Sequence, residues 1–386
     1  MFLSDTETSR EWYQKVREDA KDPVLKSASI MGLASLRRTR TRRMNATGAR
    51  AWRTGCECVW RSNGVWDFDP SGAPVLLRPD HFVRVNGREV DFGQDYFRPF
   101  ANRFARSIRA IDPRALIFLE ADANRWPLRW GAGDEPGVVF APHWYDDLVL
   151  VKKQFSPFLA LESATRRIVL GRGAVRRSLR AQLARLKRGA RECMGSVPTV
   201  LGEFGIPFDL NGARAFRTGD FRAQVKALDR SYRAIEENLL SCTIWNYTAD
   251  NSNARGDQWN GEDLSIYSRD QAVETPDSLD SGGRALEALL RPYPRATAGE
   301  PLHLSFDLAR RLFEFRFRHS ANVTAPTEIY VPNRQYPDGY RVEVSDGTFE
   351  IHREEQALWY RHGMERPVHT IRLRPAPRRR AEGFAP

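Results

Sequence analysis

The feature that most constrains the fold is a change in the spacing of apolar residues near Arg291. Before this point, four short apolar runs end in polar or aromatic residues, and patterns typical of helices lie between them. The runs are residues 115–120 (ALIFLE), 137–143 (GVVFAPH), 198–203 (PTVLGE) and 241–246 (SCTIWN). Apolar runs that alternate with helices predict parallel βα units. Polar residues placed where each run ends are typical of the active-site end of a TIM barrel.

Two of the intervening segments predict amphipathic helices. One apolar stripe at helical spacing consists of Val175, Leu179, Leu183 and Leu186, with Arg and Lys on the other face. A second helix is predicted to begin at Asp220, a good N-cap residue. Its apolar positions are Phe221, Val225, Leu228, Tyr232, Ile235 and Leu239.

After Arg291 the apolar residues alternate with polar ones, which is the period of a β-strand. The alternating sets are Leu304/Phe306, Phe313/Phe315/Phe317, Ile329/Val331 and Tyr340/Val342/Val344. Turn signals at 337–339 (PDG) and 346–347 (DG) separate them. We therefore predict a small antiparallel β-sandwich of six or seven strands over residues 300–374. The expected organisation is an irregular lead-in at 1–50, βα units at 51–292, the sandwich, and a basic disordered tail at 375–386.

Positive charge is concentrated in a few stretches of the chain. Sixty Lys and Arg against 49 Asp and Glu give a net charge of +11. Residues 37–50, 166–191 and 372–380 hold basic residues and no acid, so the remainder is net acidic. A phosphate-lined groove is therefore not expected there. The 166–191 stretch leaves two interpretations open: a solvated helix face, or contact with nucleic acid or an anionic membrane surface. We find no nucleic-acid motif, so nucleic acid is not expected as a partner.

Cysteines and apolar runs bear on compartment and cofactors. Four cysteines, with one C-x-C pair at Cys56 and Cys58, predict neither a disulfide framework nor a zinc site. No metal and no cofactor is expected. The chain has no run of about 18 apolar residues, and residues 1–26 do not resemble a secretory signal. The expected location is the cytoplasm or the periphery of intracellular membranes.

The residues at the four run ends suggest sugar chemistry. They are Glu120, His143-Trp144-Tyr145-Asp146, Glu203 and Trp245-Asn246. A carboxylate can attack an anomeric carbon, and an indole can stack on a pyranose ring. Taken singly, a Trp is more often a core residue, and a Glu after a strand is often a salt-bridge partner. Gly202 and Gly205 favour a functional role for Glu203, because flanking glycines would let the backbone turn sharply and expose the carboxylate.

Several longer motifs make the sequence recognisable. GEFGIPFDL (202–210), APHWYD (141–146) and WNYTADNSNARGDQWNGEDLSIYS (245–268) resemble glycoside hydrolase family 5. More narrowly, they are similar to its endoglycoceramidase-related branch, which includes fungal glucosylceramidases and steryl-β-glucosidases. CVWRSNGVWDFD (58–69), RPYPRATAGEP (291–301) and PTEIYVPNRQYPDGYRVEVSDG (326–347) agree with this resemblance, which covers roughly residues 50–375.

The resemblance implies a partial TIM barrel, comprising strands five to eight, and a retaining β-glycosidase acting on a glucosylated lipid. It assigns Glu203 as the nucleophile, His143 and Tyr145 as its orienting partners, and Trp245 as the stacking platform. Loop 250–263 would shape the entrance for the lipid. The further substrate-binding residues are Glu120, Trp144, Asp146, Asn246, Asp250, Asn251, Asp257, Trp259, Asn260 and Glu262.

The sequence departs from the family pattern at the second catalytic carboxyl group. A retaining glycosidase needs a nucleophile and an acid/base about 5–5.5 Å apart. The family places its acid/base Glu after an Asn at the end of the fourth strand, and no Asn-Glu pair occurs in this chain. We expect a chain that lacks the first half of the barrel and its acid/base. The alternative is a catalytically inactive glycolipid-binding or interaction protein. The sequence does not fix the oligomeric state.

Overall fold

The computed structural model describes residues 52–53, 55–120, 128–162, 165, 167–259, 261–273 and 278–377. The predicted lead-in at 1–50 and all but three residues of the predicted tail lie outside these ranges. The contacts divide the chain into two compact units, with the boundary along the sequence between Ala101 and Asn102.

The first unit contains short elements around a small apolar cluster. Its elements are α3 (Val59–Ser62), β1 (Trp66–Phe68), β2 (Pro74–Leu76), β3 (Arg84–Val85), β4 (Arg88–Glu89) and the π-helix η2 (Gly93–Phe97). β1 pairs with β2, and β3 with β4, in antiparallel hairpins. Cys58, Val65 and Trp66 are buried together. Helix α4 (Arg98–Arg109) crosses from this unit into the second.

The second unit begins with four parallel strands, one from each apolar run. They are β5 (Ile117–Leu119), β6 (Val138–Phe140), β9 (Val200–Phe204) and β10 (Ser241–Ile244). β5 pairs with β6 in parallel, and β9 pairs with β10 in parallel. Parallel bridges join residues 140 and 143, in and just beyond β6, to residues 199 and 203 of the third run. The prediction of consecutive parallel strands is therefore confirmed for these four runs.

Helices cover these strands, and two of them match the predicted stripes. Val175, Leu179 and Leu183 of α6 (Arg172–Met194) are buried in one cluster with Leu201 and Phe204. The second helix, α8 (Arg222–Glu237), has Phe221 rather than Asp220 as its N-cap. Asp220, one residue before the N-cap, still accepts a hydrogen bond from the Arg222 backbone amide, 3.1 Å away. It therefore satisfies one of the amides at the start of the helix that have no partner within the helix. Within the described ranges, no helix is long and apolar enough to cross a membrane.

Shorter elements connect these helices and strands. They are α5 (Asp147–Lys152), β7 (Leu159–Glu162), β8 (Arg167–Leu170), α7 (Leu210–Thr218), the 3₁₀ helix η3 (Arg269–Gln271) and α9 (Leu286–Leu289). β7 and β8 form an antiparallel hairpin between α5 and α6. The loop between β10 and α9 contributes no strand in the residues described, and it carries several of the predicted binding residues.

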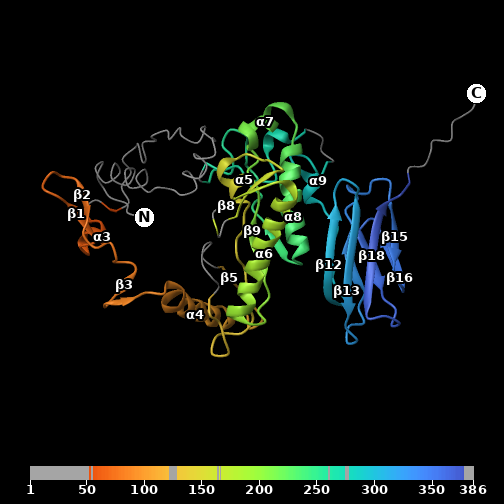
Figure 1. The fold of residues 1–386 in the computed structure, drawn as a ribbon, viewed down its shortest axis with the longest axis horizontal. Helices are drawn as coiled ribbons and strands as arrows, with labels where there is room; N and C mark the ends of the chain where they lie inside the picture. Colours follow the sequence, from red (N-terminus) through yellow and green to blue (C-terminus); the bar gives the residue numbers. More distant parts are fainter. Residues whose placement is uncertain are drawn as a thin grey trace, which may run out of the picture. The chain divides into compact units, whose positions relative to one another are not determined.

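The C-terminal part is a sandwich of two four-stranded antiparallel sheets. The first has the order β12-β13-β18-β15, which Figure 1 shows side by side in blue, and the second has the order β11-β14-β17-β16. The bounds are β11 (Tyr293–Ala296), β12 (Gly299–Asp307), β13 (Leu312–His319), β14 (Thr327–Tyr330), β15 (Tyr340–Val344), β16 (Thr348–His352), β17 (Ala357–Arg361) and β18 (Val368–Pro375).

The alternating residues of the sandwich face its core as predicted. Phe313, Phe315 and Phe317 are each no more than 1% exposed. The described sandwich contains eight strands, one or two more than the sequence pattern predicts. β11, with the sequence YPRA, has no alternation and contains a proline, so its sequence carries little strand signal.

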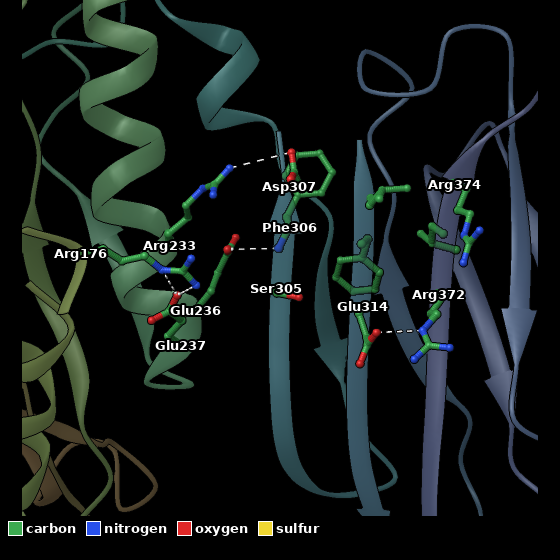
Figure 2. A pocket seen from close by; sticks show the side chains of 13 residues that line it. Arg176, Arg233, Glu236, Glu237, Ser305, Phe306, Asp307, Glu314, Arg372 and Arg374 are labelled. Atoms are coloured by element: carbon green, nitrogen blue, oxygen red, sulfur yellow. Dashed lines mark hydrogen bonds and ion pairs between the residues drawn. The ribbon is translucent and has the colours of Figure 1, made fainter. Parts of the chain in front are cut away.

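A buried ion-pair network lies where α8 meets the sandwich. Arg291 is 3% exposed, and its guanidinium lies 2.7 Å from Glu236 and 2.8 Å from Asp229. Glu236 also accepts a hydrogen bond from the backbone amide of Phe306 in β12, 3.3 Å away (Figure 2). Arg291 itself donates to the Phe306 carbonyl at 3.2 Å and thus links the carboxylates of α8 to β12.

A pocket beside this network is lined by side chains of both signs (Figure 2). Arg372 and Glu314 form an ion pair at 2.8 Å on one wall, and Arg176 pairs with Glu237 on another. Because these charges neutralise one another, the pocket offers no net charge to a ligand. It shares no lining residue with the strand ends that carry the predicted active-site residues.

Candidate active site

The carboxyl ends of β6 and β9 bring His143 and Glu203 together. A parallel bridge pairs these two residues, and the backbone amide of Trp144 donates to the Glu203 carbonyl at 2.9 Å. Adjacent parallel strands lie about 4.8 Å apart, so side chains at matched strand ends reach one another without a long loop.

The Glu203 carboxylate is engaged at both oxygens. The hydroxyl of Tyr145 donates a short hydrogen bond to Oε1, and His143 Nδ1 lies 3.3 Å from Oε2. The same His143 nitrogen lies 3.2 Å from Oε1 of Glu120, beyond the end of β5. Glu120, after β5, and Glu203, in β9, therefore both approach the imidazole of His143, which follows β6. The Glu203 side chain remains 20% exposed, so a ligand can still approach it.

Burial and negative charge shape the electrostatics of this cluster. Burial raises the pKa of Tyr145 far above its ordinary value, and the hydrogen bond to Glu203 and the charges of Glu203, Glu262 and Asp257 add to the effect. The tyrosine therefore stays protonated and donates to the carboxylate. Burial also raises the pKa of Glu262, where Lys153 opposes the shift and the charges of Asp257 and Glu203 reinforce it. Glu262 thus belongs to the same electrostatic environment as Glu203.

The two glycines around Glu203 are required by close packing of neighbouring strands rather than by a sharp turn. A Cβ on Gly205 would lie 2.2 Å from the carbonyl oxygen of Trp245, and one on Gly202 would lie 2.8 Å from that of Ala141. Neither glycine has a positive φ. The expectation that they turn the backbone is therefore wrong. They let the neighbouring segments approach closely enough to place Glu203 between them.

Trp144 and Asp146 point away from the Glu203 cluster. The Trp144 indole is 7% exposed, and its Nε1 donates to Gln182 Oε1 of α6 at 3.0 Å. Asp146 is 4% exposed and forms a short ion pair with Arg230 of α8. Burial raises the pKa of Asp146, and Arg230 opposes that shift. These two residues fix the segment to the covering helices, while His143 and Tyr145 face the opposite side.

The end of β10 supplies an exposed indole and an anchored amide. Trp245 is 37% exposed and lies beside Gly205. Asn246 Nδ2 donates to Asp257 Oδ2 at 3.0 Å. The Trp245 ring is therefore accessible to a ligand, and Asn246 is hydrogen-bonded to the loop that follows β10.

Several loop residues predicted to bind substrate instead hold the loop together. Asp257 accepts hydrogen bonds from the backbone amides of Leu264 at 2.8 Å and Ser265 at 3.1 Å. Asn251 is fully buried and donates to Asp257 at 2.9 Å and to Asp263 at 3.0 Å. These carboxylates replace the backbone partners that a loop without strands cannot supply.

The remaining loop residues are more accessible. Asp250 accepts a hydrogen bond from Gln258 at 2.6 Å on the surface, and Trp259 is 61% exposed. Glu262 is half-buried. Asn260 lies outside the described residues. The structure therefore brings together Glu120, His143, Tyr145 and Glu203, with Glu262 in electrostatic contact.

The arrangement can perform nucleophilic chemistry on a sugar. A carboxylate fixed by a tyrosine hydroxyl and a histidine is suited to attack an anomeric carbon, and an exposed indole nearby can hold a ring. The side chains with metal-ligating geometry among the described residues, His319, His362 and His369, belong to the sandwich and not to this cluster.

Comparison with known proteins agrees with this chemistry. Residues 291–373 match the glycoside hydrolase family 5 C-terminal domain. A glucosylceramidase of Rhizopus delemar is 31% identical over 359 residues, which cover 86% of this chain and 52% of that protein. An ergosteryl-beta-glucosidase of Saccharomyces cerevisiae is 27% identical over 379 residues, covering 79% and 49%.

The solved structure of Cryptococcus neoformans sterylglucosidase 1 superposes with a TM-score of 0.74 at 30% identity, covering 83% of this chain and 50% of that one. The chain thus spans about half the length of the curated relatives it matches. The resemblance indicated by the sequence motifs is confirmed.

Proposed function

We propose that this chain, a homologue of fungal glucosylceramidases and steryl-β-glucosidases with a glycoside hydrolase family 5 C-terminal domain, provides the nucleophile of a retaining β-glycosidase. Its substrate is a glucosylated lipid such as glucosylceramide or a sterylglucoside. The observation that carries the proposal is the Glu203 carboxylate, which Tyr145 and His143 hold at the end of a parallel strand.

Glu203 attacks the anomeric carbon and forms a covalent glycosyl-enzyme, with expulsion of the lipid alcohol. Tyr145 donates to one carboxylate oxygen and keeps it oriented, and its raised pKa preserves that donor. His143 lies 3.3 Å from the other oxygen and 3.2 Å from Glu120. Water then hydrolyses the glycosyl-enzyme with net retention of configuration.

The leaving alcohol of a natural lipid needs a proton, and that proton is assigned to no residue of this chain. The sequence holds no Asn-Glu pair, which is the setting of the acid/base in this family. General acid catalysis contributes about 10²–10⁴-fold. We therefore propose that the 386-residue chain reacts with activated aryl glucosides and turns over lipid glucosides very poorly.

The two exposed indoles and the basic helix fit a lipid substrate. Trp245, beside Gly205, presents an apolar ring on which a sugar could stack, and Trp259 adds a second exposed ring on the following loop for an apolar aglycone. Arg172 and Arg177 on α6 form no ion pair with another described residue and add positive charge to that helix. We propose peripheral contact with an anionic membrane surface, the source of such lipids, along this helix.

The sequence also supports a second candidate, a glycolipid-binding protein without turnover. The missing Asn-Glu pair favours it, because the strand ends can retain their tyrosine, histidine and indole without catalysis. Under this candidate, glucosylceramide binds and Glu203 has no chemical role.

The experiment compares a dinitrophenyl β-glucoside with glucosylceramide, using wild type, Glu203→Gln and the matched control Glu300→Gln in the sandwich. We expect release of dinitrophenol by wild type and by the control, and a loss on the order of 10³-fold or more in Glu203→Gln. Release that does not change in Glu203→Gln would remove the nucleophile assignment. Binding of glucosylceramide by a wild-type chain that releases no dinitrophenol from the activated glucoside would favour the second candidate.

A further inference from the structure

Three of the seven histidines of the chain gather in the C-terminal sandwich. His319 ends β13, His369 lies in β18, and His362 directly follows β17. One nitrogen from each ring lies within 4.8 Å of those of the other two. β13 and β18 belong to one sheet and β17 to the other, so the cluster bridges the two sheets of the sandwich.

The contacts of His369 fix the tautomer of its neutral ring. Its Nδ1 lies 2.8 Å from Oδ1 of Asp346, and its Nε2 lies 2.9 Å from Nδ1 of His319. A carboxylate can only accept, so in the neutral ring Nδ1 carries the hydrogen and Nε2 presents a lone pair to the cluster. This carboxylate–histidine arrangement is the one that orients metal-binding imidazoles in proteins.

Asp346 is itself held in place by two hydroxyl donors. Its Oδ1 also accepts hydrogen bonds from the Tyr360 hydroxyl at 2.7 Å and from the Ser345 hydroxyl at 2.9 Å. His369 is completely buried, so its ring has no freedom to turn away from this carboxylate.

His362 completes the group with unused hydrogen-bonding capacity. Its ring stacks on His319 with centroids 4.8 Å apart and an interplanar angle of 16°. Its Nδ1 is buried and has no hydrogen-bond partner in the part of the chain that the structure describes. A buried polar atom without a partner is costly, so a ligand at this position would be favoured. Phe317 and Tyr360 provide the apolar surroundings of the cluster.

We propose that His319, His362 and His369 bind a zinc ion, with Asp346 orienting His369. Three imidazoles and one open position for water form a common tetrahedral zinc environment. Zn–N bonds of about 2.0–2.1 Å place tetrahedral ligand nitrogens roughly 3.4 Å apart. The pair at 2.9 Å therefore separates slightly on binding, and the widest pair, at up to 4.8 Å, closes. The hydrogen on His319 Nδ1 is lost to water and Nε2 of that ring takes one up, so that His319 Nδ1 and His369 Nε2 exchange their hydrogen bond for two metal bonds.

Zinc at this position cross-links the two sheets at one end of the sandwich core. Metal that binds the folded protein and not the unfolded chain stabilises the fold by an amount that rises with the logarithm of its concentration above Kd. The proposal does not depend on the glycosidase assignment, because none of these residues lies in the Glu203 cluster.

The test titrates zinc chloride into the untagged 386-residue chain by calorimetry, with cobalt(II) absorption as the second readout. We expect one ion per chain and a rise in melting temperature with zinc. His319→Gln and His362→Gln, which are only partly buried, should weaken binding by at least about 100-fold. Asp346→Asn should weaken it by about 10–100-fold without abolishing it. His352→Gln, in the same sandwich but outside the cluster, should bind as wild type does.

Circular dichroism verifies that each variant is folded. If a variant unfolds, histidine ring ¹⁵N spectra of wild type with and without zinc identify the ligands directly. Shifts confined to His319, His362 and His369 support the site. Absence of binding at millimolar zinc, a cobalt–thiolate absorption band from cysteine, or ring shifts at His143 instead would overturn it.

Discussion

Two carboxylates in different regions of the molecule have the same kinds of partner, a tyrosine hydroxyl and a histidine ring. Glu203 contacts Tyr145 and His143 at the parallel strand ends, and Asp346 contacts Tyr360 and His369 in the sandwich. The Glu203 histidine is 30% exposed at its side chain and lies between two carboxylates. His369 is fully buried.

The difference shows that residue types alone do not define an active site. Asp346 accepts three hydrogen bonds on one oxygen and is 11% exposed, so it stabilises and orients its neighbours. Glu203 is more exposed and has acidic neighbours, Glu120 and Glu262, in place of additional donors. Its position at the open end of parallel strands makes it available to a ligand.

The largest expected effect concerns the residue that connects the two regions. Arg291→Ala leaves the buried carboxylate of Glu236 without its cation, while Asp229 keeps its ion pair with Arg233. Removing one partner of a buried ion pair costs roughly 3–5 kcal/mol of unfolding free energy. Arg295→Ala, whose pair with Glu328 is partly exposed, should cost at most about 1 kcal/mol. Denaturant unfolding measures both, and equal losses would contradict the importance of the Arg291 network.

Tyr145→Phe should impair chemistry and leave stability nearly unchanged. A hydrogen bond to a charged group contributes about 1.5–3 kcal/mol, so kcat/KM for the activated glucoside should fall by roughly 10–100-fold. Because the pKa of Tyr145 is raised, deprotonation of this residue should cause no loss of wild-type rate up to the ordinary tyrosine range near pH ~10. A drop in stability without a change in rate would show that Tyr145 stabilises the fold, as expected for Tyr360 beside Asp346, and has no role in the chemistry at Glu203.

Tyr360→Phe should show the opposite pattern. Loss of the hydroxyl removes one donor from the buried Asp346 oxygen, at a cost of about 1–3 kcal/mol in unfolding free energy. The rate per folded molecule should match that of wild type. Urea unfolding measures the loss of stability, and kcat/KM for the activated glucoside measures the rate, as for Tyr145→Phe. A rate loss larger than the loss of folded protein would contradict a purely structural role for Tyr360.

Gly205→Ala should destabilise the strand ends through contact with the Trp245 carbonyl, 2.2 Å from the added Cβ. Overpacking of this kind costs about 1–3 kcal/mol. Gly133→Ala is the matched control, since its Cβ would meet nothing within 4 Å and its φ is not positive. Equal melting temperatures for the two variants would show that neighbouring backbone can yield at Gly205.

Much of the fold could be predicted because its periodicities are strong. Apolar runs ending in Glu120, His143 and Glu203 predicted parallel strands whose ends meet, and period-two alternation predicted the sandwich. The alternation of side chains along a strand could also have separated His143 and Tyr145 from Trp144 and Asp146, which face the helices.

Other features had no local signal. Asn251 and Asp257 have the composition of ligand-binding residues, but they satisfy backbone amides of a loop whose path cannot be read from sequence. His319 and His369 lie far apart along the chain and meet only because β13 pairs with β18. Such clusters depend on strand order, which the alternating pattern leaves open.

The most direct test of the account is to trap the glycosyl-enzyme. The chain is incubated with a dinitrophenyl glucoside whose sugar carries fluorine beside the anomeric carbon, which slows hydrolysis of the covalent intermediate. Peptide mass spectrometry then locates the fluorosugar. We expect one label per chain on Glu203, formed more slowly in Tyr145→Phe and absent from Glu203→Gln. No label on wild type, or a label that persists at another residue in Glu203→Gln, would contradict Glu203 as the nucleophile.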